Sequence, residues 1–233
     1  MLYIIQNDPE VPPGLVTEEL DRLGVRWAIT HPYGGEALPD LAETEAIIVM
    51  GGAMGANDDH RHPFLTPLKG FIAHAVKQGI PYLGICLGGQ LLAAAMGARV
   101  VSRRWEELGT LTVSLTAEGR RDRLFDGMYE TFATLQWHND SFDLPKGAIL
   151  LASSQACPNQ AFRVGQQAWG LQFHPEVDEA IIRDWSAWDK DTAVRTEELV
   201  AEHRKGEAEY RKVLRRMLEN FVSMMAFKAS RDT

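Results

Sequence analysis

Cys86 stands at the junction of two patterns in the sequence. Residues 81–85 form a short apolar run typical of a buried parallel strand, and residues 90–96 have the composition of a helix. Between them, Gly88 and Gly89 permit the strained backbone of a sharp strand-to-helix turn. Such a turn presents a nucleophile above the sheet, where the helix N-terminus favours thiolate over thiol. The pattern therefore favours a nucleophilic cysteine over the alternative, a buried core cysteine.

A histidine that could serve this cysteine follows a second strand-like segment, residues 168–172. Pro175 disfavours a helical conformation at His174, so we expect that residue to be extended. Residues two apart in an extended segment point to the same side, so His174 and Glu176 can converge. The carboxylate would then orient one ring nitrogen while the other faces the thiol, which is the arrangement of a catalytic triad. A lone His-Pro-Glu tripeptide is more often a surface segment, and its position at a strand end favours a site.

A glycine loop at residues 51–55 offers a second candidate function. Gly51 and Gly52 let the backbone approach a ligand and expose N–H groups, as an oxyanion hole requires. The loop lacks the Gly-Lys-Ser/Thr ending of a phosphate loop. It also lacks the Gly-x-Gly-x-x-Gly spacing of a dinucleotide site.

A third candidate is a polar and aromatic cluster where a strand gives way to a loop. Its members are Trp137, His138, Asn139 and Asp140. A substrate-contacting loop and a hydrogen-bonded turn fit these residues equally well. His60 and His62, beside Asp58 and Asp59, have no zinc-ligand spacing and are expected to belong to a solvated loop. We therefore expect no metal and no cofactor.

Composition narrows the class of protein. The chain has 233 residues, of which 45% are hydrophobic and 24% charged, ordinary values for a globular protein with a sizeable core. A net charge of −8 argues against a nucleic-acid surface. Residues 1–5 are too short an apolar run for a signal peptide, and no run approaches the length of a membrane span. Cys86 and Cys157 do not make a disulfide framework, which favours a cytoplasmic location.

Strand and helix patterns alternate along the first half of the chain. Strands are expected at 2–5, 25–29, 46–50 and 81–85, and helices at 15–23, 63–78 and 90–96, with a short polar helix between 39 and 46. This order predicts an α/β fold with a mostly parallel central sheet, helices on both faces, and sites at the carboxyl ends of the strands.

The second half changes character. Strand-like segments at 99–102, 109–115, 130–135, 148–152, 160–164 and 168–172 predict a small antiparallel extension or a continuation of the main sheet in mixed sense. Residues after 176 are mostly helical, and 194–227 is amphipathic, as in a helix packed over the edge of a domain rather than a partner-binding helix. The expected division is a main domain at 1–185 and a C-terminal helical extension at 186–233 packed on it.

The candidate residues resemble a known family. Residues 84–90, Gly-Ile-Cys-Leu-Gly-Gly-Gln, resemble the nucleophile elbow of class I (triad-type) glutamine amidotransferases. Residues 173–176, Phe-His-Pro-Glu, match the second signature of this family, and residues 50–52 resemble its oxyanion loop. The resemblance covers about residues 1–185 and implies the three-layer flavodoxin-like fold. It is greatest to small stand-alone glutaminase-like members, a branch to which γ-glutamyl peptidases are also similar.

The resemblance implies a role for each matching residue. Cys86 would attack the side-chain amide of glutamine to form a γ-glutamyl thioester. His174 would accept the thiol proton and pass it to the leaving ammonia, and Glu176 would orient the His174 ring. The N–H groups of Gly52 and Leu87 would hold the oxyanion. The residues implied to contact the substrate are Gly51, Gln90, Trp137, His138, Asn139 and Asp140.

Departures from the family pattern lie on the glutamine side of the pocket. Ala53 stands where many relatives have proline, Gly55 where many have serine, and Asn139 where glycine is common. One reading is a glutaminase or amidotransferase that passes ammonia to a separate synthetase or acceptor protein. Another is a γ-glutamyl peptidase or hydrolase acting on a larger conjugate. A non-catalytic binding or regulatory protein is disfavoured by the intact Cys86, His174 and Glu176 set, and a homodimer is a further option.

Overall fold

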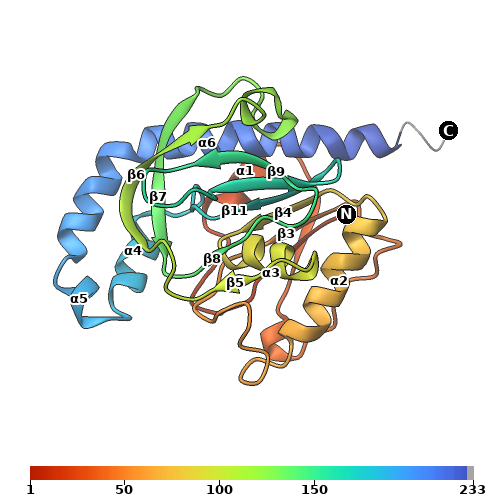
Figure 1. Cartoon of the computed structure of the whole chain (residues 1–233), viewed down its shortest axis with the longest axis horizontal. Helices are drawn as coiled ribbons and strands as arrows, with labels where there is room; N and C mark the ends of the chain where they lie inside the picture. Colours follow the sequence, from red (N-terminus) through yellow and green to blue (C-terminus); the bar gives the residue numbers. More distant parts are fainter. Residues whose placement is uncertain (230–233) are drawn as a thin grey trace.

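A nine-stranded mixed sheet runs through residues 1–229, the part of the chain that the computed structural model describes (Figure 1). In the order in which they pair, the strands are β2 (Trp27–Thr30), β1 (Leu2–Ile5), β3 (Ala46–Val49), β4 (Tyr82–Ile85), β11 (Ala168–Leu171), β10 (Ala161–Val164), β9 (Ile149–Ser153), β6 (Glu107–Leu115) and β7 (Thr131–His138). Pairing is parallel from β2 to β11 and antiparallel from β11 to β7. A separate two-stranded sheet joins β5 (Val100–Val101) to β8 (Ser141–Phe142).

Helices cover both faces of the sheet, as the alternating pattern predicts. They are α1 (Leu15–Arg22), α2 (Leu65–Lys77), α3 (Leu87–Ala95), α4 (Glu179–Ser186), α5 (Lys190–Ala193) and α6 (Thr196–Ala229), with 3-10 turns η1 (Pro32–Gly34), η2 (Gly119–Arg121) and η3 (Arg123–Phe125). In β3, Ile48 points into a core shared with α1 and α6, while Ile47 and Val49 point into a core shared with α2 and α3. The two-residue alternation of strand side chains thus fills both cores. The expected three-layer α/β class is confirmed.

Helix α6 packs along the sheet with the apolar side that its amphipathic pattern indicates (Figure 1). Its buried residues include Tyr210, Val213, Leu214, Met217, Leu218 and Phe221. The Phe221 ring meets Trp169 of β11 edge-on, with ring centroids 6.3 Å apart. Among the described residues, no helix combines the length and the apolar character needed to cross a bilayer.

One expectation about the elements is wrong, and one that was left open is settled. The short polar helix expected between residues 39 and 46 is a turn. Asp40 accepts a hydrogen bond from the Ala42 N–H with its side chain and one from the Thr44 hydroxyl with its carbonyl, and such local bonds compete with a helix. Of the two arrangements expected for the later strands, the structure has the continuation of the main sheet in mixed sense, because β10, β9, β6 and β7 belong to that sheet.

Glycines let α3 lie directly on the strand ends. A Cβ atom on Gly88 would lie 2.1 Å from the Val49 carbonyl oxygen, and one on Gly89 would lie 2.5 Å from that of Leu171. A Cβ on Gly84 would lie 2.3 Å from the Gly88 oxygen. Because those neighbours are backbone atoms, a larger residue would push the helix, and with it the adjacent Cys86, away from the sheet.

The substitution Gly88→Ala is therefore expected to lower the free energy of unfolding by about 3 kcal/mol. Gly70→Ala is the matched control, since Gly70 lies within α2 and nothing is within 4 Å of its added Cβ. The free energy of unfolding of Gly70→Ala should rise by about 0.5–1 kcal/mol, because alanine loses less backbone entropy than glycine when it enters a helix. Urea unfolding of both variants tests the pair, and equal stabilities would contradict the close approach of α3.

Candidate active site

Cys86 occupies the sharp turn between β4 and α3, with φ 50° and ψ −107°. A positive φ is costly for a residue other than glycine and persists only where the surroundings enforce it. Two backbone hydrogen bonds do so: the Cys86 N–H donates to the Leu171 carbonyl at 2.9 Å, and its carbonyl accepts from the Gln90 N–H at 2.9 Å. The side chain is mostly buried, at 8% exposure, and lines a cavity.

His174 and Glu176 form a buried pair, as their extended spacing predicts. The His174 Nδ1 donates to the Glu176 carboxylate at 2.8 Å. The backbone is fixed by the His174 N–H, which donates to the Leu135 carbonyl at 2.9 Å. The other ring nitrogen, Nε2, is buried without a regular hydrogen bond among the described residues. It is therefore free to exchange a proton with a reacting group.

The structure brings this pair to Cys86. A Cβ on Gly51 would lie 3.3 Å from the His174 Cε1 and 3.8 Å from the Cys86 Cβ, so both side chains converge beside that glycine. Burial disfavours a charged imidazole. The negative charges of Glu176 and Cys86, together with the hydrogen bond to Glu176, outweigh burial and raise the pKa of His174 to about 10. The ring is thus held ready to carry a proton.

The two residues whose amides are expected to hold an oxyanion are neighbours in the fold. Leu87 is the first residue of α3, so its N–H has no acceptor within the helix. A Cβ on Gly52 would lie 2.7 Å from the Leu87 Cδ2, which places the glycine loop beside the helix start. The loop is held by the Asn7 side-chain amide, which donates to the Met50 carbonyl at 2.7 Å.

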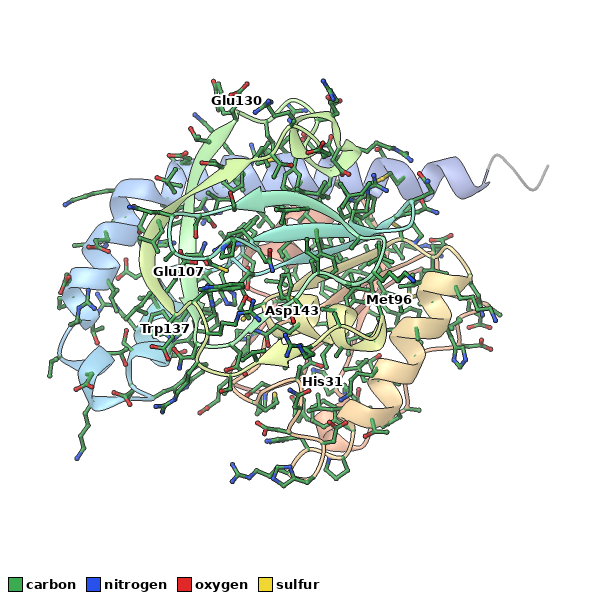
Figure 2. All side chains as sticks on the ribbon, in the orientation of Figure 1. His31, Met96, Glu107, Glu130, Trp137 and Asp143 are labelled. Atoms are coloured by element: carbon green, nitrogen blue, oxygen red, sulfur yellow. The ribbon has the colours of Figure 1, made fainter. Side chains whose placement is uncertain are left out.

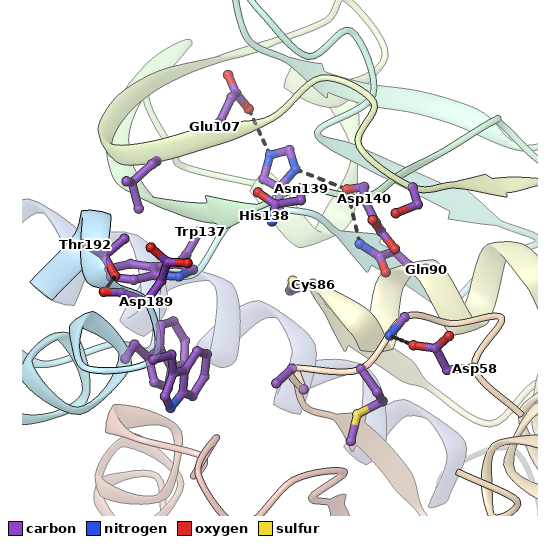
Figure 3. Close-up of a pocket in the computed structure, with 18 of the residues that line it drawn as sticks. Asp58, Cys86, Gln90, Glu107, Trp137, His138, Asn139, Asp140, Asp189 and Thr192 are labelled. Atoms are coloured by element: carbon purple, nitrogen blue, oxygen red, sulfur yellow. Dashed lines mark hydrogen bonds and ion pairs between the residues drawn. The ribbon is translucent and has the colours of Figure 1, made fainter. Parts of the chain in front are cut away.

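A cavity of about 620 Å³ opens above Cys86 (Figure 3). Besides Cys86, six of the expected site residues line it: Gly52, Gln90, Trp137, His138, Asn139 and Asp140. Gly51 is buried beneath the cavity, against His174. Sequence reasoning missed the wall contributed by Trp185, Trp188, Asp189, Asp191 and Thr192. Trp185 and Trp188 also line a narrow pocket that joins Cys86 to His174.

Two buried glutamines connect the cavity to the thiol. The Gln90 Nε2 donates to the Gln172 side-chain oxygen at 3.3 Å and to the Asp140 carbonyl at 3.3 Å. The Gln172 Nε2 in turn donates to the Cys86 sulfur at 3.6 Å. Gln172 was not among the expected site residues. It lies two positions before His174 in the extended segment, and the same two-residue spacing could have identified it.

His138 is engaged at both ring nitrogens. Its Nδ1 lies 3.1 Å from the Asp140 carbonyl oxygen and its Nε2 lies 3.0 Å from the Glu107 carboxylate. The cluster at 137–140 is therefore a hydrogen-bonded turn that also lines the cavity, and its contact with a substrate stays a prediction. Figure 2 labels Glu107 and Trp137, which come from the paired strands β6 and β7.

Metal-ligating atoms converge at one place among the described residues. Those of Glu107, His138 and Cys157 lie within 4.8 Å of one another. The Glu107 carboxylate also accepts hydrogen bonds from Ser154 and Gln160, so the cluster is held as a hydrogen-bonded network. In the loop that contains His60 and His62, the carboxylates of Asp58 and Asp59 both bind nearby protein groups. Asp58 accepts from the Gly55 N–H, and Asp59 pairs with Lys69 at 2.7 Å.

The structure is an α/β fold that gathers a cysteine, a histidine and a glutamate at the carboxyl ends of parallel strands. Comparison with known protein families identifies the family. The model of the class-I glutamine amidotransferase family matches residues 16–181, and the chain belongs to this family.

Individual relatives agree. The chain is 34% identical over 156 residues to the glutamine amidotransferase-like protein YfeJ of Salmonella typhimurium, covering 65% of this chain and 64% of that protein. It is 30% identical over 166 residues to a subunit of the glutamine-hydrolysing GMP synthase of Sulfolobus acidocaldarius, and the match covers 70% of this chain and 82% of that subunit. A glutamine amidotransferase structure from Thermotoga maritima superposes with a TM-score of 0.86 at 30% identity, covering 95% and 97%.

Proposed function

We propose that the protein hydrolyses the side-chain amide of glutamine through a thioester on Cys86. The observation that supports this most directly is the combination of a strained Cys86 turn with a His174 ring whose Nδ1 is fixed by Glu176 and whose Nε2 is free to exchange a proton. In a family of glutamine amidotransferases, this is the layout that a nucleophile, its base and the orienting carboxylate require.

The reaction follows from the positions of these groups. His174 takes the thiol proton as the Cys86 sulfur attacks the amide carbon, and the N–H groups of Gly52 and Leu87 stabilise the oxyanion that forms. His174 then gives the thiol proton to the leaving nitrogen, the C–N bond breaks and ammonia departs. Water, deprotonated by the same ring, cleaves the thioester to glutamate and restores the thiol. Glu176 keeps the ring oriented and stabilises its charged form.

The residues that line the cavity support glutamine as the substrate. Gln90 and the residues from His138 to Asp140 offer amide, imidazole and backbone groups to the amino-acid end of glutamine, while Trp137 packs against Trp185 beside the reacting amide. The two cysteines of the chain are free thiols, and a thiol nucleophile fits a reducing compartment such as the cytoplasm.

Released ammonia would pass to an acceptor. One relative is named as a subunit of a GMP synthase, which suggests that this chain works with a separate synthetase protein. A second copy of the chain is the other candidate partner.

The size of the cavity favours a second candidate activity. A volume of about 620 Å³ falls in the range of sites for drug-sized ligands, about 300–1,000 Å³, whereas glutamine is a single amino acid. A γ-glutamyl peptidase or hydrolase that releases a larger amine would use the same thioester chemistry and fill more of this space.

The decisive assay measures glutamate and ammonia released from glutamine by the purified protein. We expect the two products in equal amounts, and acid quenching should trap a γ-glutamyl adduct on the peptide that contains Cys86. Failure to release glutamate from both glutamine and γ-glutamyl peptides would overturn the proposal. Release from the peptides alone would select the second candidate.

A further inference from the structure

The cavity extends past Cys86 in two directions. Figure 3 shows Gln90, Asp140 and Asp58 on one side of the sulfur, and Asp189 and Thr192 on the other. A γ-glutamyl amide bound at Cys86 is divided in the same way, because the reacting carbonyl separates the γ-glutamyl half from the amine half. Each side of the cavity must therefore receive one half of the substrate.

The position of His174 identifies the leaving-group side. This ring must protonate the departing nitrogen, so the amine half lies on the side of the ring. Trp185 packs against His174 with ring centroids 5.0 Å apart, and Trp188 stacks on Trp185 at 5.5 Å. Asp189 follows Trp188 directly in the chain and lines the same wall. The Trp188 and Asp189 wall is thus the wall of the amine half.

This wall has the chemistry of an amine site. Tryptophan faces attract ammonium groups, and carboxylates pair with them through charge-assisted hydrogen bonds. Asp189 and Asp191 supply carboxylates beside Trp185 and Trp188, which is a second, independent reason to expect a cation there. Among the described residues that line the cavity there is neither lysine nor arginine.

Glutamine would leave this wall unused, because its leaving group is ammonia. We propose that the preferred substrates are γ-glutamyl amides of amines that carry a second, positively charged group. This inference deepens the proposed function and rests on it. The Cys86 sulfur forms the bond to the side-chain carbonyl carbon of the glutamyl group, the C–N bond breaks, and the proton from His174 goes to the leaving nitrogen. Water then gives glutamate and the free thiol, and the distal ammonium of the released amine is unchanged.

The test compares kcat/KM for four compounds: γ-glutamyl-1,4-diaminobutane, γ-glutamylbutylamide, γ-glutamyl-4-aminobutyrate and glutamine. We expect the cationic amide to exceed the neutral butylamide by about tenfold and the anionic amide to be the poorest of the conjugates. The preference should shrink when ionic strength is raised to about 1 M, because exposed charges are then screened.

Matched variants test whether Asp189 and Asp191 cause the preference for the cationic amide. The double variant Asp189→Asn, Asp191→Asn should lower the ratio of the cationic to the neutral amide by about tenfold. Asparagine can still cap α5, where the Asp189 side chain now accepts from the Asp191 N–H, so the segment keeps its fold. Asp184→Asn is the control, since Asp184 lies on α4, exposed and away from the cavity lining, and should leave the ratio unchanged.

The outcomes separate the two proposals. Equal kcat/KM for the cationic and neutral amides, or an unchanged ratio in the double variant, would overturn the amine site and leave the thioester mechanism standing. Absence of hydrolysis with all four compounds would instead overturn the proposed function on which the amine site depends.

Discussion

Replacing Cys86 by alanine is expected to reduce glutamate release by about 10⁴-fold or more. The thiol is the only proposed nucleophile, and the oxyanion donors and cavity that remain can assist only the attack of water. Initial rates at saturating glutamine, followed by glutamate detection, measure the loss. Comparable rates in wild type and variant would show that the chemistry lies elsewhere.

Two controls separate chemistry from folding. Cys157→Ala removes the other free thiol, which lies buried against Ser141 and does not line the cavity, and should keep activity. Cys86→Gly should be as inactive as the alanine variant yet more stable by about 1 kcal/mol, because glycine relieves the positive φ of the turn. If Cys86→Gly is inactive yet more stable than Cys86→Ala, the protein keeps a strained backbone at this turn in order to hold the reactive thiol.

Glu176→Gln is expected to lower kcat by about 10²–10⁴-fold, as for loss of the orienting carboxylate in a triad. The glutamine can still accept from the His174 Nδ1 but no longer stabilises the charged ring. Glu179→Gln is the control. It removes surface ion pairs with Arg183 and Arg204, lies three residues away, and should leave kcat unchanged. A kcat for Glu176→Gln within a few-fold of wild type would argue against the triad.

The same variant should change how stability depends on pH. Because the fold raises the pKa of His174 from 6.5 to about 10, the charged ring stabilises the folded state fully below pH 6.5. This contribution is lost as pH rises through about 10. The gap in unfolding free energy between wild type and Glu176→Gln is therefore largest near pH 6 and shrinks toward pH 10. Urea titrations at pH 6, 8 and 10 measure it, and a gap that widens with pH would contradict the charged pair.

Short-range patterns were sufficient for much of the architecture and for the core of the site. The apolar run before Cys86, its glycines and the two-residue spacing of His174 and Glu176 are local features, and the structure places those residues together as expected. The family assignment follows from the same segments and is confirmed by the family model. The roles of the individual residues stay predictions until the variants are measured.

What the sequence did not reveal depends on contacts between distant segments. Glu107 meets His138 across 31 residues, and its own strand pattern carries no sign of a buried carboxylate. Trp185 and Asp189 reach the cavity only because the segment after Glu176 turns back over Cys86. Periodicity operates within a short window, and these partners lie outside it. The helix expected between residues 39 and 46 failed for a different reason, because the local bonds of Asp40 favour a turn that composition alone does not reveal.

The central place of β11 in the sheet has a consequence for biosynthesis. This strand is the last of the nine to be made, yet it pairs with β4 on one side and β10 on the other. A nascent chain that ends before residue 168 therefore carries two unpaired strand edges facing an empty slot, a state open to misassembly with other chains. The His174 and Glu176 pair arrives with the same segment, and the Glu176 carbonyl accepts from the Leu15 N–H at the start of α1. Completion of the sheet and assembly of the proposed site are thus one late folding event, so appearance of activity would report directly on closure of the sheet.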